Sequence, residues 1–496
     1  MRRFLTVIIL IISVVAVTGC NSSVYNVTNY GAKGNGITLD SPAINAAIDA
    51  ADTNGGGTVY FPPGTYKSGS IRLKDNITLN LHADATILAT DTNDFDMWDY
   101  NPWEEYQGFH SHWKCSLIWA IERNNIAITG SGLINGDTMT KGRPKPYYGD
   151  RAISFKSCNG VTIEGISIYR GGSAAIRVTG CNDVDISSVL IDTNRDGMNI
   201  DCCNNVNITN CIVNSPCDDS ICLKSTYALG YKKPTENVII SGCKVSGYDV
   251  GSVMSGSPIP DTSCYSCGSI KFGTESNGGF KNIAITDCTF DHSRGFMLAT
   301  VDGGDIENIN IDNIKMSSIN DSPIFLRLGN RARGPGPPPP GTYRNVNISN
   351  VTCSSSLSKM SCIISGIPGH YIEDVNLTNI NISYSGGGTA EDAAIVLPEK
   401  EDGYPYGGML GSVTPSYGFY IRHAKGIEFH NSQFDFASDD VRPAFMLVDV
   451  NGFELDSVGA ERSVSNVSHI KFDRVDDINI HDCPDFPLKD GLNKAN

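Results

Sequence analysis

Short runs of alternating apolar and polar residues recur along most of the chain, and each run follows an asparagine, aspartate or glycine. The alternation has a period of two, which indicates strands with one buried face. The runs begin at Asn76-Ile77, Asn125-Ile126, Gly160-Val161, Asp183-Val184, Asn205-Val206, Asn237-Val238, Asn282-Ile283, Asn308-Ile309, Asn345-Val346, Asp374-Val375, Gly426-Ile427 and Asp477-Ile478.

The spacing of these runs predicts how the strands are arranged. Val161 to Val184 is 184 − 161 = 23 residues, and Val184 to Val206 is 206 − 184 = 22 residues. Longer gaps contain Gly-, Pro- and Tyr-rich insertions, as at 226–234 and 255–267. Strands of three to five residues that repeat at this spacing are typical of a parallel β-helix. A β-propeller would need a longer period and four strands in each unit.

A helical stretch from about Ser41 to Ala51 precedes the repeats and carries Ala43, Ile44, Ala47 and Ile48 on one face. We interpret it as a cap over the first rung, because an uncapped end would expose unpaired strand edges. The expected fold class is therefore all-β: a single-domain, right-handed parallel β-helix over residues 21–496 with an N-terminal capping helix.

The first 20 residues read as an export signal. Two arginines are followed by an apolar run from Phe4 to Val17 and then by Thr18-Gly19-Cys20. The run is short for a membrane span. The last residues resemble a bacterial lipoprotein box, which predicts lipidation at Cys20 and a location in the periplasm or at the outer membrane or cell surface. The alternative is an ordinary signal peptide with a chance cysteine.

The formal net charge of −16 argues against nucleic acid and against an anionic membrane surface as partners, apart from the lipid anchor. Of the 16 cysteines, Cys211, Cys243 and Cys288 each fall five residues after a strand aliphatic. They are expected as free thiols that stack on successive rungs. Cys264 and Cys267 are candidates for a local disulfide. Ligand spacing for a metal site is not evident, so no metal is expected.

Three aspartates carry the candidate chemistry. Asp196 and Asp218 are 218 − 196 = 22 residues apart, close to one repeat, so Asp196 is expected beside Asp218 and Asp219 on the next rung. Aspartates are common at β-helix turns, but three carboxylates on adjacent rungs are costly unless they act on a substrate. Inverting glycoside cleavage needs one carboxyl as acid and another to activate water. We assign Asp218 as the acid, and we expect Asp196 and Asp219 to hold and activate the water.

At these residues the chain resembles glycoside hydrolase family 28, the polygalacturonase and rhamnogalacturonan hydrolase family. Its motifs stand as Asn194-Arg195-Asp196-Gly197 and as Asp218-Asp219-Ser220-Ile221 with Leu223-Lys224-Ser225. The resemblance implies a pectin-lyase-like β-helix that is a monomer. It also implies an inverting hydrolase of pectic polysaccharide or oligosaccharide that needs no metal or other cofactor.

Two departures bear on the substrate. The family's Gly-His-Gly motif has no histidine counterpart between Gly247 and Gly279, and its Arg-Ile-Lys motif is replaced at both basic positions, by Met297 and Ala299. In polygalacturonases that pair grips a galacturonate carboxylate. We therefore expect a rhamnogalacturonan-type substrate rather than plain galacturonan. The candidate substrate-binding residues are Asn194, Lys224, Lys271 and Arg327.

Two other interpretations remain open from the sequence. A polysaccharide lyase on the same fold would need a Ca²⁺ site and an Arg or Lys base. A non-catalytic glycan-binding or adhesive β-helix would tolerate the loss of any one aspartate.

Overall fold

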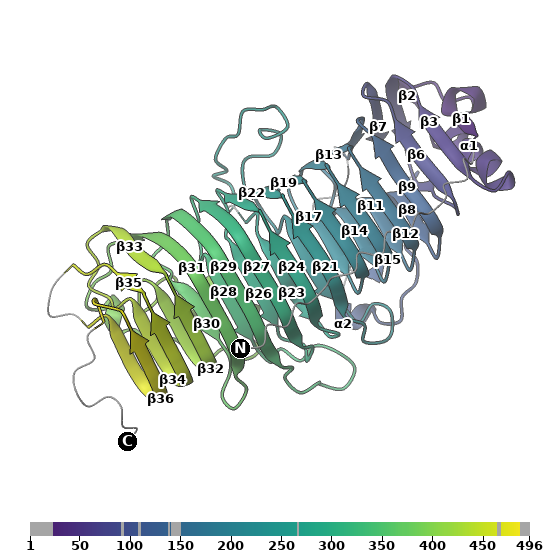
Figure 1. The fold of residues 1–496 in the computed structure, drawn as a ribbon. Coiled ribbons are helices and arrows are strands. Elements are labelled where there is room, and N and C mark those ends of the chain that lie inside the picture. Colours follow the sequence, from purple (N-terminus) through teal and green to yellow (C-terminus); the bar gives the residue numbers. More distant parts are fainter. Residues whose placement is uncertain are drawn as a thin grey trace, which may run out of the picture.

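The chain forms a parallel β-helix, as the repeat predicts (Figure 1). The computed structural model describes residues 23–90, 94–107, 111–136, 139, 150–264, 267–463 and 468–486. Within them, strands from Val24 to His481 form one continuous parallel ladder. The predicted signal segment and Cys20 lie outside the described residues, so their assignment stays a prediction.

Each rung contributes strands to three faces of the stack. The first face contains β5 (Ile71–Arg72), β8 (Ser116–Ile121), β11 (Arg151–Lys156), β14 (Ala174–Thr179), β17 (Asp196–Asp201), β20 (Ile221–Ser225), β23 (Ile270–Ser276), β26 (Phe296–Thr300), β28 (Ile324–Leu328) and β30 (Cys362–Ser365). The second contains β1 (Val24–Asn26), β3 (Gly57–Phe61), β6 (Ile77–Leu81), β9 (Asn124–Gly130), β12 (Asn159–Glu164), β15 (Asn182–Ser187), β18 (Asn204–Thr209), β21 (Thr235–Ser241) and β24 (Phe280–Thr286). The third contains β2 (Asn35–Leu39), β4 (Gly64–Ser68), β7 (Ala85–Ala89), β10 (Leu133–Asn135), β13 (Ser167–Tyr169), β16 (Leu190–Asp192), β19 (Ile212–Asn214), β22 (Lys244–Ser246) and β25 (Thr289–Asp291).

Towards the C-terminus the strands become longer than the predicted three to five residues, because single strands bend through two faces. They are β27 (Ile306–Ser317), β29 (Tyr343–Ser356), β31 (Ile372–Gly386), β32 (Phe419–His430), β34 (Phe445–Asp456) and β36 (Ile470–His481), with the shorter β33 (Gln433–Ser438) and β35 (Gly459–Ala460) beside them. Within β27, Asn308 and Asn313 bend the strand at φ 60° and 53° without breaking its pairing.

The Asn, Asp and Gly residues that open the sequence runs all adopt positive φ, from 52° at Asp183 to 70° at Gly160. This region of backbone space strongly favours these residue types. Their amides also bond from rung to rung: Asn282 donates to Asn237 at 3.0 Å, and Asn308 donates to Asn282 at 2.9 Å. The aliphatics that follow them stand in register, as Val161 does with Val184. The repeat therefore marks the bend and the core position together.

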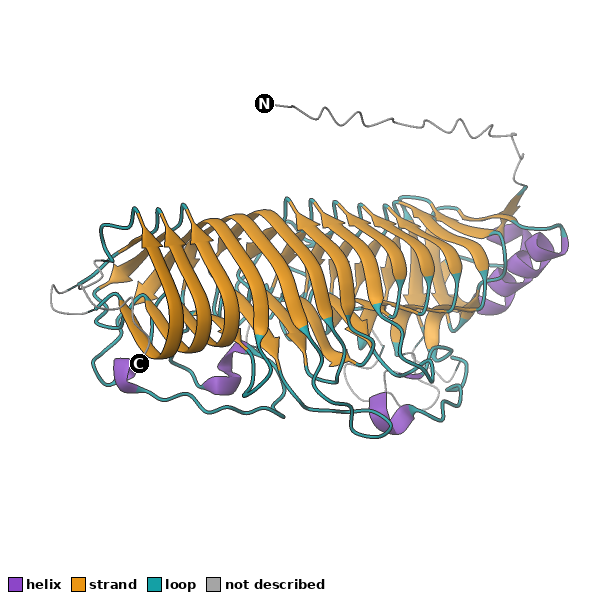
Figure 2. Cartoon of the chain, turned by 60° about the horizontal axis from the view of Figure 1, so that its bottom comes forward, coloured by secondary structure: helices purple, strands orange, loops and turns teal. Residues whose placement is uncertain are grey.

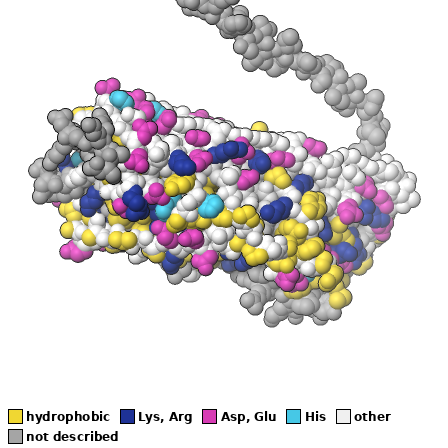
Figure 3. All heavy atoms as spheres, turned by 90° about the horizontal axis from the view of Figure 1, so that it is seen from below, with side chains coloured by type: hydrophobic (Ala, Val, Ile, Leu, Met, Phe, Trp, Pro, Cys, Tyr) yellow, Lys and Arg dark blue, Asp and Glu magenta, His cyan; other side chains and the backbone are white. Residues whose placement is uncertain are grey.

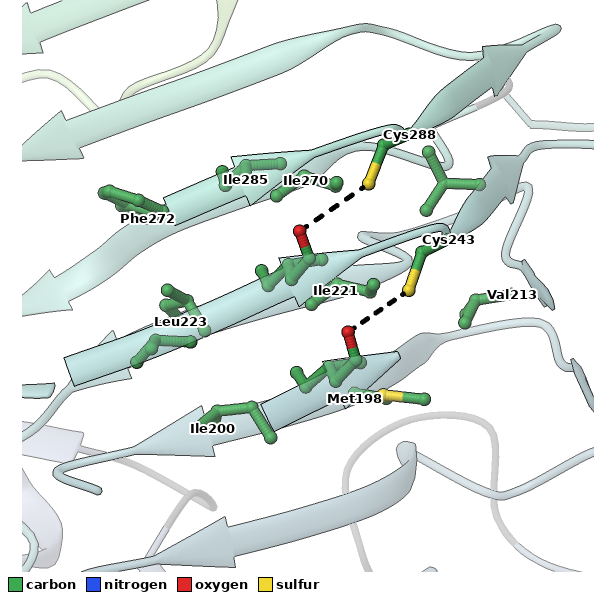
Figure 4. Close-up of a cluster of buried hydrophobic side chains, with 14 of the residues drawn as sticks. Met198, Ile200, Val213, Ile221, Leu223, Cys243, Ile270, Phe272, Ile285 and Cys288 are labelled. Carbon is green, nitrogen blue, oxygen red and sulfur yellow. Dashed lines mark hydrogen bonds between the residues drawn. The ribbon is translucent and has the colours of Figure 1, made fainter. Parts of the chain in front are cut away.

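The stacked cysteines are confirmed as buried free thiols (Figure 4). Cys243 Sγ donates to the Ile208 carbonyl at 3.6 Å, and Cys288 Sγ donates to that of Ile240 at 3.9 Å, one rung further on. The expected Cys264–Cys267 pair is wrong, because Cys264 bonds to Cys217 across 47 residues of sequence. Cys267 lies three residues before β23, and its N–H donates to the Pro216 carbonyl at 2.8 Å.

The predicted cap is confirmed as α1 (Ser41–Thr53), which buries Ile44, Ala47, Ile48 and Ala51 against the first strands. A 3-10 turn, η1 (Val27–Tyr30), lies beside it. A second α-helix, α2 (Glu104–Gln107), is a single turn. No helix in the described part of the chain combines the length and apolar character needed to cross a membrane.

Long loops leave the stack on one side, with α2 near one end of that side and two 3-10 turns near the other (Figure 2). The turns η3 (Asp392–Ala394) and η4 (Gly407–Leu410) belong to residues 387–418, which connect β31 to β32 and which we call the strap. Apolar strap residues pack on the outward side chains of the first face. The cluster comprises Leu397, Met409 and Leu410 from the strap with Met297, Phe325, Met360, Ile363 and Tyr420.

Candidate active site

The three aspartates meet at the first face, where β17 and β20 are neighbours. Asp196 opens β17, and the N–H of the following Gly197 donates to the Asp219 carbonyl at 2.9 Å, which ties the two rungs together. A Cβ on Gly197 would lie 2.3 Å from Val213 Cγ1, so only glycine allows this approach. One carboxylate oxygen from each of Asp196, Asp218 and Asp219 lies within 4.8 Å of the others. The predicted juxtaposition is confirmed.

Asp219 is held as a carboxylate. It is buried, with Lys271 Nζ 3.1 Å from Oδ2 and the Ser269 hydroxyl donating to Oδ1. Burial pushes the pKa of Asp219 upward, but the charge of Lys271, the Ser269 hydrogen bond and the charge of Lys224 outweigh it and leave the pKa below the usual value. Asp219 is therefore ionised and able to accept a proton from a water.

Asp218 is pushed the other way. Burial raises its pKa well above the usual value, and the charges of Asp196 and Asp219 raise it further. Arg195 opposes this shift, with its guanidinium Nη2 2.8 Å from Asp218 Oδ2. With 22% of its side chain exposed, Asp218 is the carboxyl of the trio most open to a ligand. Two neighbouring carboxyls with opposite pKa shifts are the arrangement expected of an acid and a base.

Asp196 is positioned by its own strand. The Asn199 side-chain amide donates to Asp196 Oδ2 at 2.9 Å, while Asn199 Oδ1 is buried without a partner among the described residues. Two oxygens within 4.8 Å match the span of one bridging water, because two hydrogen bonds of about 2.8 Å at a tetrahedral angle cover about 4.5 Å. Asp196 and Asp219 are thus close enough to hold one water between them.

Three of the four predicted substrate-binding residues lie in or next to the site. Lys271 pairs with Asp219, and Asn194 Oδ1 lies 3.4 Å from the Cys217 sulfur, just before Asp218. Lys224 Nζ lies 3.1 Å from Glu275 Oε2. Burial opposes the charge of Lys224, but Glu275 and Asp196 among its neighbours keep its pKa well above the usual value.

Arg327 is placed elsewhere. It is fully buried on β28, where it donates to the Ser365 hydroxyl and to the strap carbonyls of Glu399 and Lys400, both at 3.0 Å. Arg422 donates in the same way to the carbonyls of Pro398 and Glu399. The structure thus shows Arg327 anchoring the strap, and it does not bring this side chain to the trio.

Sequence reasoning missed several residues that touch the site: Ser269 and Asn199, described above, and also Tyr404 and Arg195. Tyr404 of the strap accepts a hydrogen bond from Lys271 Nζ at 3.0 Å, and its ring lies under the same ammonium at 4.9 Å. The only signal was the gap of 427 − 375 = 52 residues between two consecutive run aliphatics, which indicates an insertion but not its path. Arg195 was visible as a member of the first motif, but its contact with Asp218 was not.

The charges around the trio are close to balanced, in contrast with the acidic whole. Six basic side chains form ion pairs there with acidic ones: Arg195, Lys224, Lys271, Arg294, Arg331 and Arg333. Viewed from below, basic and acidic side chains are also interspersed rather than separated into one-sign patches (Figure 3). The net charge of −16 therefore does not by itself exclude an acidic sugar from this site.

The three aspartates are also the one carboxylate cluster in the described residues that is close enough to hold a metal ion. Two of its members already have cationic partners, Asp218 with Arg195 and Asp219 with Lys271. A bound cation would have to displace or oppose both of them, so the donor set suits a metal poorly.

The positions of the missing basic pair are closed. Met297 and Ala299 are 2% and 1% exposed, and Met297 lies in the apolar cluster beneath the strap. Loss of the basic pair therefore does not leave an open surface, because the apolar contact between Met297 and the strap occupies the place of one basic residue.

Comparisons with known proteins agree with this fold. A family model described as "Rhamnogalacturonase A/epimerase, pectate lyase-like" matches residues 24–94. An exo-poly-alpha-D-galacturonosidase of Dickeya chrysanthemi is 38% identical over 134 residues, which cover 25% of this chain and 21% of that protein. A probable polygalacturonase of Vitis vinifera is 26% identical over 268 residues, covering 48% and 53%. The chain thus spans about half or less of the length of these curated relatives.

A solved structure gives the same result for the fold. The exopolygalacturonase of Thermotoga maritima superposes with a TM-score of 0.63 and covers 83% of this chain and 92% of its own. At 18% identity this likeness concerns the architecture alone.

Proposed function

Because this chain is a glycoside hydrolase family 28-like protein, we propose that it is an exported hydrolase that cleaves glycosidic bonds of a pectic polysaccharide or oligosaccharide. The observation that carries the proposal is the convergence of three carboxylates from adjacent rungs. Within this cluster, burial and the neighbouring carboxylates raise the pKa of Asp218, whereas Lys271 and Ser269 lower that of Asp219. Asp218 protonates the leaving oxygen. Asp219 and Asp196 hold the water and take its proton as it attacks the anomeric carbon.

Elimination, the chemistry of a lyase, fits these residues less well. It needs a neutral basic side chain to remove a proton, and the buried candidates are Lys224 and Lys271. Burial lowers the pKa of each, but neighbouring groups, including Glu275 for Lys224 and Asp219 for Lys271, raise it well above the usual value. Both side chains therefore stay protonated near neutral pH, which favours hydrolysis over elimination.

We expect inversion of the anomeric configuration and full activity in EDTA. Inverting enzymes usually have carboxyl groups about 6.5–9.5 Å apart, and retaining enzymes about 5–5.5 Å. The nearest oxygens here lie within 4.8 Å, so this distance alone does not assign the stereochemistry. Proton NMR of the first-formed product decides it. A retained anomer would sink the water-activating role of Asp196 and Asp219, and an EDTA-sensitive 4,5-unsaturated product would establish a lyase.

We further propose that the substrate is of the rhamnogalacturonan type rather than plain galacturonan. Met297 and Ala299 supply no cation, and the strap closes their positions, so a galacturonate carboxylate finds no ionic partner there. The expected result is a higher kcat/KM on rhamnogalacturonan fragments than on oligogalacturonides of equal length. Faster cleavage of the oligogalacturonides by the unmodified enzyme would refute the preference.

The variant Met297→Arg sharpens this test. Since Met297 packs beneath the strap, we expect the arginine to lower the Tm and displace the strap rather than to create galacturonan activity. Ile239→Arg, at an exposed position of β21, provides a control for an arginine that replaces an apolar side chain. Lipidation at Cys20 remains part of the proposal, and incorporation of labelled palmitate into the wild type but not into Cys20→Ala would test it.

A further inference from the structure

We propose that Arg195 moves away from Asp218 to bind the carboxylate of a galacturonate unit. This movement couples substrate binding to protonation of the acid. The inference rests on the proposed pectic substrate, because galacturonate occurs in both galacturonan and rhamnogalacturonan. It gives Arg195 the role of a specificity and positioning residue.

Arg195 is among the accessible cations of the site. Its side chain is 36% exposed, against 5% for Lys271 and 7% for Lys224. Its backbone is fixed, since the Ser215 hydroxyl donates to the Arg195 carbonyl at 2.6 Å. A ligand that reaches the trio therefore meets this guanidinium before it meets the buried lysines.

The present pose of Arg195 leaves hydrogen-bonding capacity unused. Nη2 lies 2.8 Å from Asp218 Oδ2, but Nε is buried and has no partner among the described residues. Arginine binds carboxylates best through two parallel hydrogen bonds. A substrate carboxylate that draws the guanidinium outward would let Arg195 form such a pair and satisfy the orphan donor.

The movement of Arg195 from Asp218 to the substrate carboxylate has a defined effect on Asp218. The charged groups that face it are Asp196, Asp219, Arg195, Lys271 and Arg294, with the thiol of Cys267 also close. Arg195 is in direct contact with the Asp218 carboxylate. When Arg195 moves away, the negative charges of Asp196 and Asp219 become the main influence on the pKa of Asp218 and raise it. Asp218 then takes one proton from solvent, no covalent bond changes, and this proton is later delivered to the leaving oxygen.

Isothermal titration calorimetry with galacturonic acid and with neutral galactose tests this coupling without any turnover. Repeating each titration in buffers of different ionisation enthalpy gives the number of protons taken up. Because the pKa of Asp218 already lies above the usual aspartate value in the free protein, we expect little uptake at acidic pH. Uptake towards one proton per galacturonate is expected at higher pH, between this pKa and the still higher pKa of Asp218 in the complex. Galactose is expected to cause none. Galacturonate binding without proton uptake at every pH, or no tighter than galactose, would overturn the proposal.

Two matched variants locate the effect. Arg195→Gln is expected to weaken galacturonate binding about 10- to 100-fold and to abolish the proton uptake. Arg333→Gln removes another exposed guanidinium of the site, one that pairs with Glu275 rather than with Asp218, and should keep the uptake. Equal uptake in Arg195→Gln and the wild type would refute the role of Arg195.

A kinetic arm separates this inference from the proposed function. In Arg195→Gln the acid loses its cationic partner, so the pKa of Asp218 rises and the alkaline limb of kcat/KM moves to higher pH. If the alkaline limb of kcat/KM does not move in this variant, Arg195 does not control the protonation of Asp218. Galacturonan and rhamnogalacturonan fragments are assayed side by side to identify the source of the galacturonate. Proton-linked galacturonate binding with no hydrolysis of either polymer would defeat the proposed function and leave the recognition by Arg195 standing.

Discussion

Asp218→Asn is expected to lower kcat by about 10²- to 10⁴-fold, the usual contribution of a positioned general acid. The amide keeps the shape of the side chain but has no proton to give to the leaving oxygen. Because Asp218 is partly exposed and its one ion pair within the described part of the chain is with Arg195, the variant should fold normally. Initial rates on the preferred pectic fragment, with circular dichroism and Tm as checks on folding, measure both expectations.

Asp201→Asn is a useful contrast. Asp201 is a fully buried aspartate on the same strand as Asp196, but it bonds to Arg177 and Thr226 rather than to the trio. Its loss should reduce stability more than turnover per folded molecule. Wild-type turnover in Asp218→Asn would remove the acid from the mechanism and favour a non-catalytic glycan-binding role.

The second large effect is expected from Lys271→Met. Removing one member of a buried ion pair leaves Asp219 without its closest cation and costs about 3–5 kcal/mol of stability. Lys271 is the strongest influence that lowers the pKa of Asp219, so this pKa should rise in the variant. Asp219 must be ionised to accept the water's proton, and the acidic limb of kcat/KM therefore moves to higher pH.

The pH–rate profile distinguishes this mechanism from simple loss of folding. Lys271→Arg keeps the charge and should restore much of the acidic limb, whereas Lys244→Met, at an exposed position of β22, should leave the profile unchanged. An acidic limb that stays in place in Lys271→Met would show that Lys271 does not set the ionisation of Asp219.

The fold could be read from the sequence because one local feature specifies it. Positions such as Asn282 and Asn308 must adopt positive φ, and each is followed by an aliphatic that stacks in register. The same register places Asp196 beside Asp219 from the sequence alone. Because the rungs stack, two residues that are 22 positions apart in the sequence lie close together in space.

The parts that escaped prediction all depend on loops that follow no period. Cys264, in the insertion at 255–267, pairs with Cys217, in the short turn between β19 and β20, and no spacing rule anticipates that contact. Arg327 looked like a ligand-binding cation from its sequence neighbours, whereas its guanidinium is used by strap carbonyls. Tyr404 could not be placed at all, because nothing in its own segment indicates where the strap runs.

The strap has a consequence for when the site becomes complete. Lys271 and Tyr404 are 133 residues apart in sequence, whereas the three aspartates lie within two consecutive rungs. Repeats of this kind depend mainly on their neighbours, and domains fold from the N-terminus during synthesis. The carboxylates therefore assemble while much of the chain is still unmade. Only after β32 has added its rung does Tyr404 reach Lys271, so a nascent chain holds its acid and base well before its finished binding surface.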